Sequence, residues 1–156
     1  MAEVVQLQHK RNQCLEFSGY QEKYREDILK LCFECSKELD TFFKPTRKHF
    51  EKILDAGQEY LVLLIDNNKA VGIIGGLPCF SFLCPEPAWQ EAIYYLRPQY
   101  RSYSKELYEY LEFLLKQREI KVITMTAACN DKFKLTNRYF KMLGFEQMET
   151  HYAKRI

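Results

Sequence analysis

The stretch from Tyr94 to Leu111, YYLRPQYRSYSKELYEYL, has the residue types and spacing in this chain that are best suited to chemistry. An apolar, strand-like segment passes through Pro98 into a strongly helical one. Several folds hold phosphate with this layout, because the unsatisfied amides and the dipole of a helix N-terminus favour an anion. Phosphate loops usually carry glycines, but none occurs between Gly76 and Gly144. The stretch therefore indicates a phosphate-binding architecture whose chemistry has been either altered or lost.

Six cysteines raise the question of a metal or redox site. Cys32 and Cys35 have C-x-x-C spacing, but both fall on the apolar stripe of an expected helix, where cysteine packs as a small hydrophobe. A zinc site would need two more ligands, for which Cys79 and Cys84 are the other close pair. The N-terminus has no apolar run long enough for a signal peptide. We therefore expect the cysteines to be free thiols in a reducing compartment, and we expect no bound metal.

The composition predicts one globular domain. The 156 residues carry a formal net charge of +2, and 28% are charged. Acidic and basic residues are intermixed, which does not favour nucleic acid, although tyrosines interleave with Arg97 and Arg101. Aromatic residues reach 15%, which favours a dense core or a protein contact surface. The longest apolar runs, such as Leu61–Ile65, are far too short for a membrane span. We expect a cytoplasmic protein with neither nucleic acid nor membrane as a partner.

Hydrophobic periodicity predicts four helices that position these residues. They are expected from about Gln21 to Leu39, over Arg47–Ala56 and ended by Gly57, around Leu107–Leu115, and over Lys132–Leu143 with Gly144 as its cap.

Strand-like runs alternate with these helices. Strands are expected at Cys14–Phe17, Glu59–Asp66, Lys69–Gly76, Trp89–Leu96, Ile120–Thr126 and Phe145–Ile156. Asn67 and Asn68 tolerate the positive φ of a tight hairpin turn. Residues 77–87 hold three prolines and are expected to form a loop, and residues 1–13 a loose arm. The fold class is thus α/β: one domain over residues 14–156, with a mixed, mostly antiparallel sheet and a central parallel strand–helix–strand unit flanked by helices.

Three sequence blocks, in the right order, resemble the GNAT acetyltransferase superfamily. KAVGIIGG resembles the third strand of that fold, and IYYLRPQYR resembles its fourth strand with the start of the acyl-CoA loop. NRYFKMLGF, from Asn137 to Phe145, resembles the closing signature of the family. The ending ETHYAKRI is similar to the endings of phage-encoded members, which implies the host cytoplasm or a virion as the location.

The resemblance implies that acetyl-CoA lies between the fourth and fifth strands as the co-substrate. Its pyrophosphate would be held at the loop that opens the central helix, and an amine would attack the thioester directly. The implied cofactor-binding residues are Arg97, Arg101, Ser102, Tyr103, Ser104, Lys105 and Asn137. The candidate bases are Glu91, with Glu86 behind it, and His151, which titrates in a useful range. A solvated strand acid and a packed or surface histidine are the structural alternatives.

The chain departs from the family pattern at two points. The two small residues of the loop pattern fall on Ser104 and Glu106. Serine is tolerable, but Glu106 adds bulk and negative charge beside a polyanion. At ~5 Å and an effective dielectric constant of about 20, the repulsion is about 3 kcal/mol, or on the order of a hundredfold in affinity. Glutamate also suits the first turn of any helix. The tyrosine that protonates the leaving thiolate in many members is replaced by Phe140, which has no proton to donate.

Two hypotheses follow from the sequence. The chain is either an acetyl-CoA-dependent N-acetyltransferase acting on a small-molecule or protein amine, or a GNAT-fold protein that no longer catalyses. In the second case it would serve as a binding or structural component with protein partners, for example in a phage particle. Glu106 discriminates between them, because its side chain would block the cofactor site if it pointed into the cleft.

Overall fold

The computed structural model describes residues 5–6, 15–39, 44–81, 84–128 and 131–147. The chain divides into two units, Met1–Thr124 and Met125–Ile156, and each is described by itself. No helix in the described ranges is long and apolar enough to cross a membrane.

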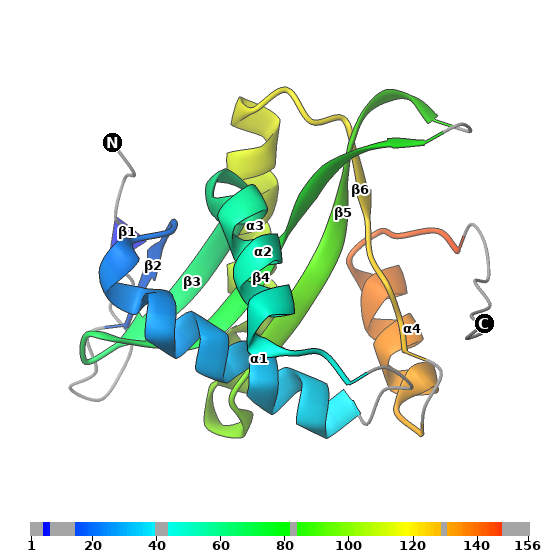
Figure 1. Cartoon of the computed structure of the whole chain (residues 1–156). Coiled ribbons are helices and arrows are strands. Elements are labelled where there is room, and N and C mark those ends of the chain that lie inside the picture. The colour runs from blue at the N-terminus through cyan, green and yellow to red at the C-terminus, as the bar shows by residue number, and fades with distance from the viewer. Residues whose placement is uncertain (1–4, 7–14, 40–43, 82–83, 129–130, 148–156) are drawn as a thin grey trace. The chain divides into compact units, whose positions relative to one another are not determined.

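The first unit is built on one sheet with the strand order β1-β2-β3-β4-β5-β6 (Figure 1). Neighbouring strands are antiparallel, except that β5 and β6 are parallel. The strands are β1 (Val5–Gln6), β2 (Leu15–Ser18), β3 (Leu61–Asp66), β4 (Lys69–Ser81), β5 (Cys84–Leu96) and β6 (Val122–Thr124). The mixed, mostly antiparallel sheet predicted from the sequence is confirmed. Val5 and Gln6, which lie in the expected N-terminal arm, pair with β2.

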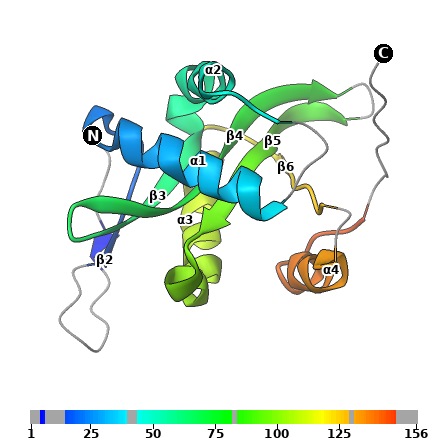
Figure 2. The ribbon, with the colours of Figure 1, turned by 60° about the horizontal axis from the view of Figure 1, so that its bottom comes forward.

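Three α-helices cover this sheet. They are α1 (Arg25–Leu39), which follows the short 3-10 helix η1 (Glu22–Tyr24), α2 (Arg47–Gly57) and α3 (Ser104–Gln117). Figure 2 shows α1 and α2 over one face of the sheet and α3 on the other. The periodicity had predicted all three. Thr46 begins α2 by accepting a hydrogen bond from the backbone N–H of His49 through its side chain, at 3.3 Å, as an N-cap does.

The core on the α1–α2 face is formed by side chains that the helical and strand periods bring together. Ile28, Leu29 and Cys32 of α1 and Leu54 of α2 are buried against Leu61, Leu63 and Ile65 of β3 and Ile73 of β4. The intervening residues Val62 and Leu64 are also buried. They belong to the opposite sheet face, where Leu107, Leu111 and Leu115 of α3 are buried. All six residues of β3 are thus buried, because both of its faces are covered.

Two turns behave as the sequence predicts. Asn67 and Asn68 have φ values of 48° and 62° and join β3 to β4. In the second unit, α4 (Phe133–Met142) is followed by Gly144 with a φ of 91°, the left-handed conformation that favours glycine.

The expectation of a loop over residues 77–87 is wrong. β4 continues to Ser81 and β5 begins at Cys84, so the two strands form a long hairpin. Pro85 and Pro87 lie on β5 before its pairing with β6 begins at Ala88, and Pro78 is tolerated because β4 is paired with β3 only as far as Gly75. Beyond that residue one edge of β4 needs no ladder hydrogen bonds, and proline is accepted at such an edge.

Gly57 has a different role from the one predicted. It closes α2 with a φ of −108°, so it is not a left-handed cap. A Cβ atom placed on it would lie 2.8 Å from the carbonyl oxygen of Gly76. Glycine is therefore needed because the helix end packs directly on β4.

The predicted elements after α3 are shorter in the structure. The strand expected over Ile120–Thr126 is reduced to β6, and Phe145–Gln147 do not form the expected last strand. Residues 148–156, including His151, lie outside the described residues.

Candidate active site

A β-bulge in β5 marks the centre of the candidate site. Gly75 pairs with Ile93 and Gly76 with Glu91, which leaves Ala92 without a partner residue on β4. The bulge needs glycine on the facing strand, because a Cβ atom on Gly76 would lie 2.0 Å from the carbonyl oxygen of Gln90. Bulges bend a strand and redirect its side chains, and they often lie next to active sites.

The parallel pairing of β5 and β6 ends one residue before Glu91. Ala88, Trp89 and Gln90 pair with Val122, Ile123 and Thr124. The rest of β5, from Glu91 to Leu96, pairs with β4 alone among the described residues. The pairing of β5 with β6 therefore ends, together with β6 itself, at the point where the bulge begins.

The loop after β5 leads into α3 through a short 3-10 helix, η3 (Pro98–Tyr103). The N-cap residue of α3, Tyr103, makes no side-chain capping hydrogen bond. No capping side chain at Tyr103 therefore compensates the dipole at this helix start, and such a helix start suits the binding of a pyrophosphate. Ser102, Tyr103, Ser104 and Lys105, all predicted to bind the cofactor, lie at this junction.

Two tyrosines hold the loop in place. The Tyr94 hydroxyl lies 2.6 Å from the carbonyl oxygen of Ser104 and 2.7 Å from its Oγ. The Tyr100 hydroxyl donates a hydrogen bond of 2.6 Å to Oδ2 of Asp66, whose side chain is buried. This hydrogen bond, together with burial, raises the pKa of Tyr100 to about 12. Neither tyrosine was singled out for this role from the sequence, because their partners lie on other elements.

The two arginines predicted to bind cofactor already have carboxylate partners on α1. Arg97 donates to both carboxylate oxygens of Glu34, each at 2.9 Å. Arg101 does the same with Glu38, each at 2.6 Å. Glu34 and Glu38 are four residues apart and so lie on one side of the helix. Because exposed pairs of this kind are weak, an anion at the loop can compete for the arginines.

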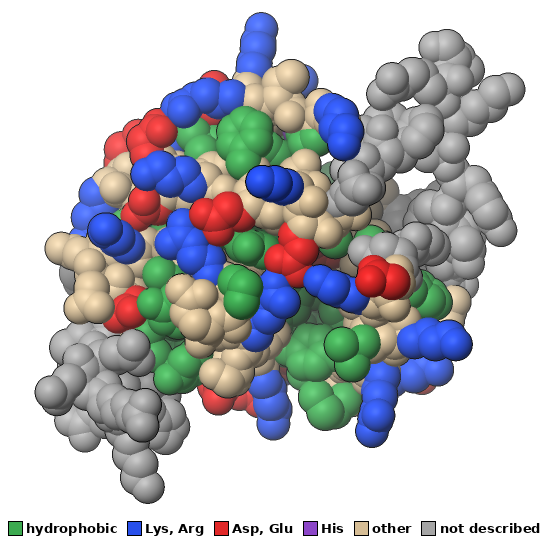
Figure 3. Space-filling model, turned by 90° about the horizontal axis from the view of Figure 1, so that it is seen from below, with side chains coloured by type: hydrophobic (Ala, Val, Ile, Leu, Met, Phe, Trp, Pro, Cys, Tyr) green, Lys and Arg blue, Asp and Glu red, His purple; other side chains and the backbone are tan. Residues whose placement is uncertain are grey.

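Charges of both signs also lie close together on the surface seen in Figure 3, where Lys and Arg side chains are interspersed with Asp and Glu side chains. Lys105 follows this pattern at the loop, since its Nζ lies 3.6 Å from Oε1 of Glu109. The site thus offers cations whose charges are partly compensated.

Glu106 lies in the first turn of α3, and its side chain is partly buried. Its Oε2 atom is fully buried and has no hydrogen-bond partner among the described residues. Burying a carboxylate oxygen without a partner is costly. Its negative charge at the helix start opposes the binding of a pyrophosphate, as the sequence predicted.

A cavity of about 270 Å³ lies between α1, α2 and strands β4 and β5. Its wall includes Ala92 and Ile93 at the bulge, Cys35 and Ser36 from α1, and His49 and Ile53 from α2. The described residues that line it include no Asp, Glu, Lys or Arg. The bulge thus lies between the end of the β5–β6 pairing and an apolar pocket that is open to solvent on one side.

Glu91 borders this cavity. It directly precedes Ala92, and its charge acts on the thiol of Cys35, which lines the wall. Burial first, and then the charge of Glu91, raise the pKa of Cys35 to about 12. The predicted base and the apolar cavity therefore lie together.

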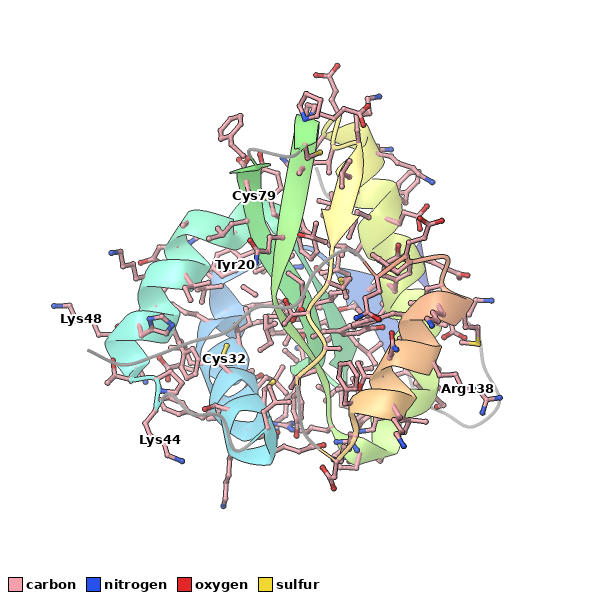
Figure 4. All side chains as sticks on the ribbon, turned by 90° about the vertical axis from the view of Figure 1, so that its right-hand side faces the viewer. Tyr20, Cys32, Lys44, Lys48, Cys79 and Arg138 are labelled. Atoms are coloured by element: carbon pink, nitrogen blue, oxygen red, sulfur yellow. The ribbon has the colours of Figure 1, made fainter. Side chains whose placement is uncertain are left out.

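The cysteines do not form one cluster. Figure 4 shows Cys32 on α1 and Cys79 on the distant part of β4. Cys32, Cys35, Cys79 and Cys84 are free thiols. Burial raises the pKa of Cys32 to about 12 as well, so the first pair packs as small apolar side chains. Within the described residues, no group of three or more His, Cys, Asp or Glu could hold a metal ion.

The second unit contains Asn137 and Phe140 on α4. The ring of Phe140 contacts those of Tyr139 and Phe145, with centroids 6.2 Å and 5.7 Å apart. Phe140 is thus held by aromatic packing within its own unit. Asn137 remains a sequence-based prediction for cofactor binding, and so does His151 for catalysis.

Comparisons with known proteins agree with this geometry. Residues 23–145 match the model of the acetyltransferase (GNAT) family. No curated protein matches the chain. Among solved structures, the aminoglycoside N-acetyltransferase AAC(6')-Iy in complex with CoA has a TM-score of 0.71 at 13% identity, covering 96% of this chain and 99% of its own.

Two further structures have similar folds. The ribosomal-protein-alanine N-acetyltransferase of Brucella melitensis biovar Abortus 2308 has a TM-score of 0.70 at 12% identity, covering 91% of this chain and 99% of its own. An aminoglycoside acetyltransferase from an uncultured soil metagenomic sample, in complex with sisomicin, has a TM-score of 0.66 at 15% identity, covering 92% and 96%. At these identities the three structures establish the fold, a single α/β GNAT domain.

Proposed function

Because the chain belongs to the acetyltransferase (GNAT) family, we propose that it transfers an acetyl group from acetyl-CoA to the amine of a small molecule. The observation that carries this proposal is the bulge at Ala92. It lies where the pairing of β5 with β6 ends, and it also forms part of the wall of the apolar cavity. A cofactor between the strands and an acceptor in the cavity would thus meet at one residue.

The residues at the loop would hold the cofactor by its pyrophosphate. The start of α3, near Ser102 to Lys105, supplies a helix dipole without a side-chain cap, and Arg101 supplies a guanidinium that can exchange Glu38 for phosphate. When bound, acetyl-CoA would supply an acetyl thioester as the group donor.

Glu91 would act as the base. At the pH of the cell a primary amine is an ammonium ion. It must lose a proton before its nitrogen can attack a carbonyl carbon. The Glu91 carboxylate, beside Ala92 and close enough to act on Cys35, would accept that proton directly or through one water. Nitrogen would then form the amide bond as the carbon–sulfur bond breaks, and its second proton would be released to water. Phe140 cannot protonate the departing thiolate, so water would do so.

A second candidate function is a GNAT-fold protein without catalysis, serving as a binding or structural component. Two observations favour it. Oε2 of Glu106 is buried at the start of α3, and Arg97 and Arg101 are both occupied by carboxylates. An origin in a phage particle belongs to this candidate and rests on the resemblance of residues 149–156 alone.

Thermal melting with acetyl-CoA tests the proposal. A ligand at 100 times its dissociation constant stabilises the folded state by about 2.7 kcal/mol, which raises the melting temperature by a few degrees in a domain of this size. We expect Glu106→Ala to bind acetyl-CoA on the order of a hundredfold more tightly than the natural chain. Glu112→Ala, farther along the same helix and paired with Lys116, is the matched control and leaves the affinity within a few-fold.

Stabilisation of the natural chain by millimolar acetyl-CoA supports the acetyltransferase. If only Glu106→Ala is stabilised, the architecture is retained but natural cofactor binding is lost, which selects the second candidate. No stabilisation of either protein overturns the proposed cofactor site.

A further inference from the structure

The lining of the cavity between α1, α2, β4 and β5 limits which amine could enter it. Among the described residues of its wall no side chain is charged, and the polar groups are the thiols of Cys32 and Cys35, the hydroxyl of Ser36 and the imidazole of His49. Each of the two thiols is held in its neutral form by burial, which raises its pKa to about 12. Most of the remaining wall is aliphatic or aromatic, with Ile28, Leu39, Phe50 and Ile93 among its members.

Such a wall does not suit an acceptor with several positive charges. Moving an ammonium group out of water costs several kcal/mol or more unless it is paired, and pairing requires carboxylates. The cavity wall provides none. An aminoglycoside of the kind bound in the metagenomic neighbour would therefore have to leave its charges unpaired in an apolar space.

One end of the cavity is suited to a single positive charge. Ala92 in the wall directly follows Glu91, and both Glu91 and Glu38 act electrostatically on Cys35. Glu38 is paired with Arg101, so the negative charge beside the bulge is that of Glu91, and the other described residues of the wall are uncharged. This arrangement matches a ligand with one ammonium group and an apolar body.

The size of the cavity defines the apolar body. A protein cavity of about 150 Å³ lined by Leu, Ile and Phe binds benzene. The volume of about 270 Å³ therefore accommodates one aromatic ring and a short alkyl chain.

We propose that the acceptor is a primary amine carried on a single apolar group of about the size of a phenylalkyl chain, with the apolar group in the cavity and the amine at Glu91. This inference rests on the proposed function and specifies the class of its acceptor. Burial of the ring would supply most of the affinity, while Glu91 orients the nitrogen.

The test compares amines that differ in one feature. 2-Phenylethylamine and ethanolamine both carry a primary amine on a two-carbon chain, but only 2-phenylethylamine has an aromatic ring. Sisomicin serves as the polycationic comparison. Binding is measured by calorimetry without acetyl-CoA, and turnover by release of free thiol with it. We expect 2-phenylethylamine to bind at least tenfold more tightly than ethanolamine and to be acetylated at least tenfold faster than either other amine.

Two substitutions on α1 locate the binding site. Ser36 lines the cavity and Lys37 does not, and Lys37 is exposed. Ser36→Phe should fill the cavity and lower the affinity for 2-phenylethylamine at least tenfold, while Lys37→Phe should leave this affinity unchanged. Both variants should keep the melting shift caused by acetyl-CoA. If Ser36→Phe does not fold, Ser36→Leu, which adds a smaller apolar side chain at the same place in the wall, replaces it.

The outcomes separate this inference from the proposed function. Equal binding of 2-phenylethylamine and ethanolamine, unchanged binding after substitution of Ser36, or faster acetylation of sisomicin overturns the apolar acceptor but leaves an acetyltransferase that binds acetyl-CoA. Absence of any effect of acetyl-CoA overturns the proposed function. In that event, ring-dependent binding that Ser36→Phe abolishes would still establish the cavity as an apolar amine site.

Discussion

The Tyr94 hydroxyl lies 2.6 Å from the carbonyl oxygen of Ser104 and 2.7 Å from its Oγ. The contact joins β5, two residues after the bulge, to the first residue of α3. The strand that carries the candidate base and the helix start that would hold the pyrophosphate are thus fixed relative to each other.

Removing this hydroxyl should loosen the loop. We expect Tyr94→Phe to lower the free energy of unfolding by about 1 kcal/mol and to weaken acetyl-CoA binding several-fold, since the start of α3 loses its anchor. Urea unfolding and cofactor titration measure the two effects. Tyr95→Phe on the same strand is the control, because no hydrogen bond of the Tyr95 hydroxyl holds the loop. Equal effects of the two substitutions would contradict the anchoring role.

The ion pair between Arg101 and Glu38 competes with an anion at the loop. We expect Glu38→Gln to raise the affinity for acetyl-CoA several-fold, because it releases the guanidinium, and Arg101→Gln to lower it. Calorimetric titration at low and high salt measures both changes. Glu51→Gln, which removes the partner of Arg47 in α2, should have no effect on the affinity. If Glu38→Gln weakens binding instead, the pair positions the loop and does not compete with the cofactor.

The hydrogen bond from Tyr100 to Asp66 should make stability depend on pH in the alkaline range. The pKa of Tyr100 is raised from 10.0 to about 12 in the folded chain. Between these values the unfolded chain releases the phenolic proton while the folded chain keeps it. The stabilisation is therefore complete below pH 10 and is lost as the pH rises towards 12.

Tyr100→Phe should remove the loss of stability between pH 10 and 12. It should also lower the free energy of unfolding by roughly 1–3 kcal/mol at neutral pH, because the buried Asp66 carboxylate loses a hydrogen-bond donor. Urea unfolding at a series of pH values provides the measurement. Tyr103→Phe, with no hydrogen bond of its hydroxyl in the described structure, should change neither quantity. A natural chain whose stability between pH 10 and 12 falls no faster than that of Tyr100→Phe would disprove the assignment.

The bulge depends on glycine at position 76. A methyl group there would lie 2.0 Å from the carbonyl oxygen of Gln90 and 2.7 Å from the ring of Trp89. We expect Gly76→Ala to lower the free energy of unfolding by about 3 kcal/mol or more. Gly19→Ala is the matched control, because nothing lies within 4 Å of its added Cβ, and it should change stability by less than about 1 kcal/mol. Similar unfolding curves for the two variants would show that the strands adjust and that the bulge is not fixed by this glycine.

The sequence by itself determined the elements whose cause is local. Helical periods gave α1, α2, α3 and α4, and the Asn67-Asn68 pair gave the turn between β3 and β4, because side-chain spacing and allowed φ values act over a few residues. The same local view failed at residues 77–87. The prolines there suggested a loop. In the structure, β3 pairs with β4 only as far as Gly75, so Pro78 lies on a strand edge that has no neighbouring strand in the described ranges.

The tertiary structure alone decided how the candidate site is assembled. Arg101 meets Glu38 across 63 residues, and Ala92 bulges because Gly75 and Gly76 face it from another strand. Neither relationship leaves a periodic signal, although two adjacent glycines in a strand hint at a close backbone approach. The apolar cavity likewise exists only where α1 and α2 cover β4 and β5. Secondary structure follows from neighbours in the chain, but a site depends on distances between segments that only packing brings together.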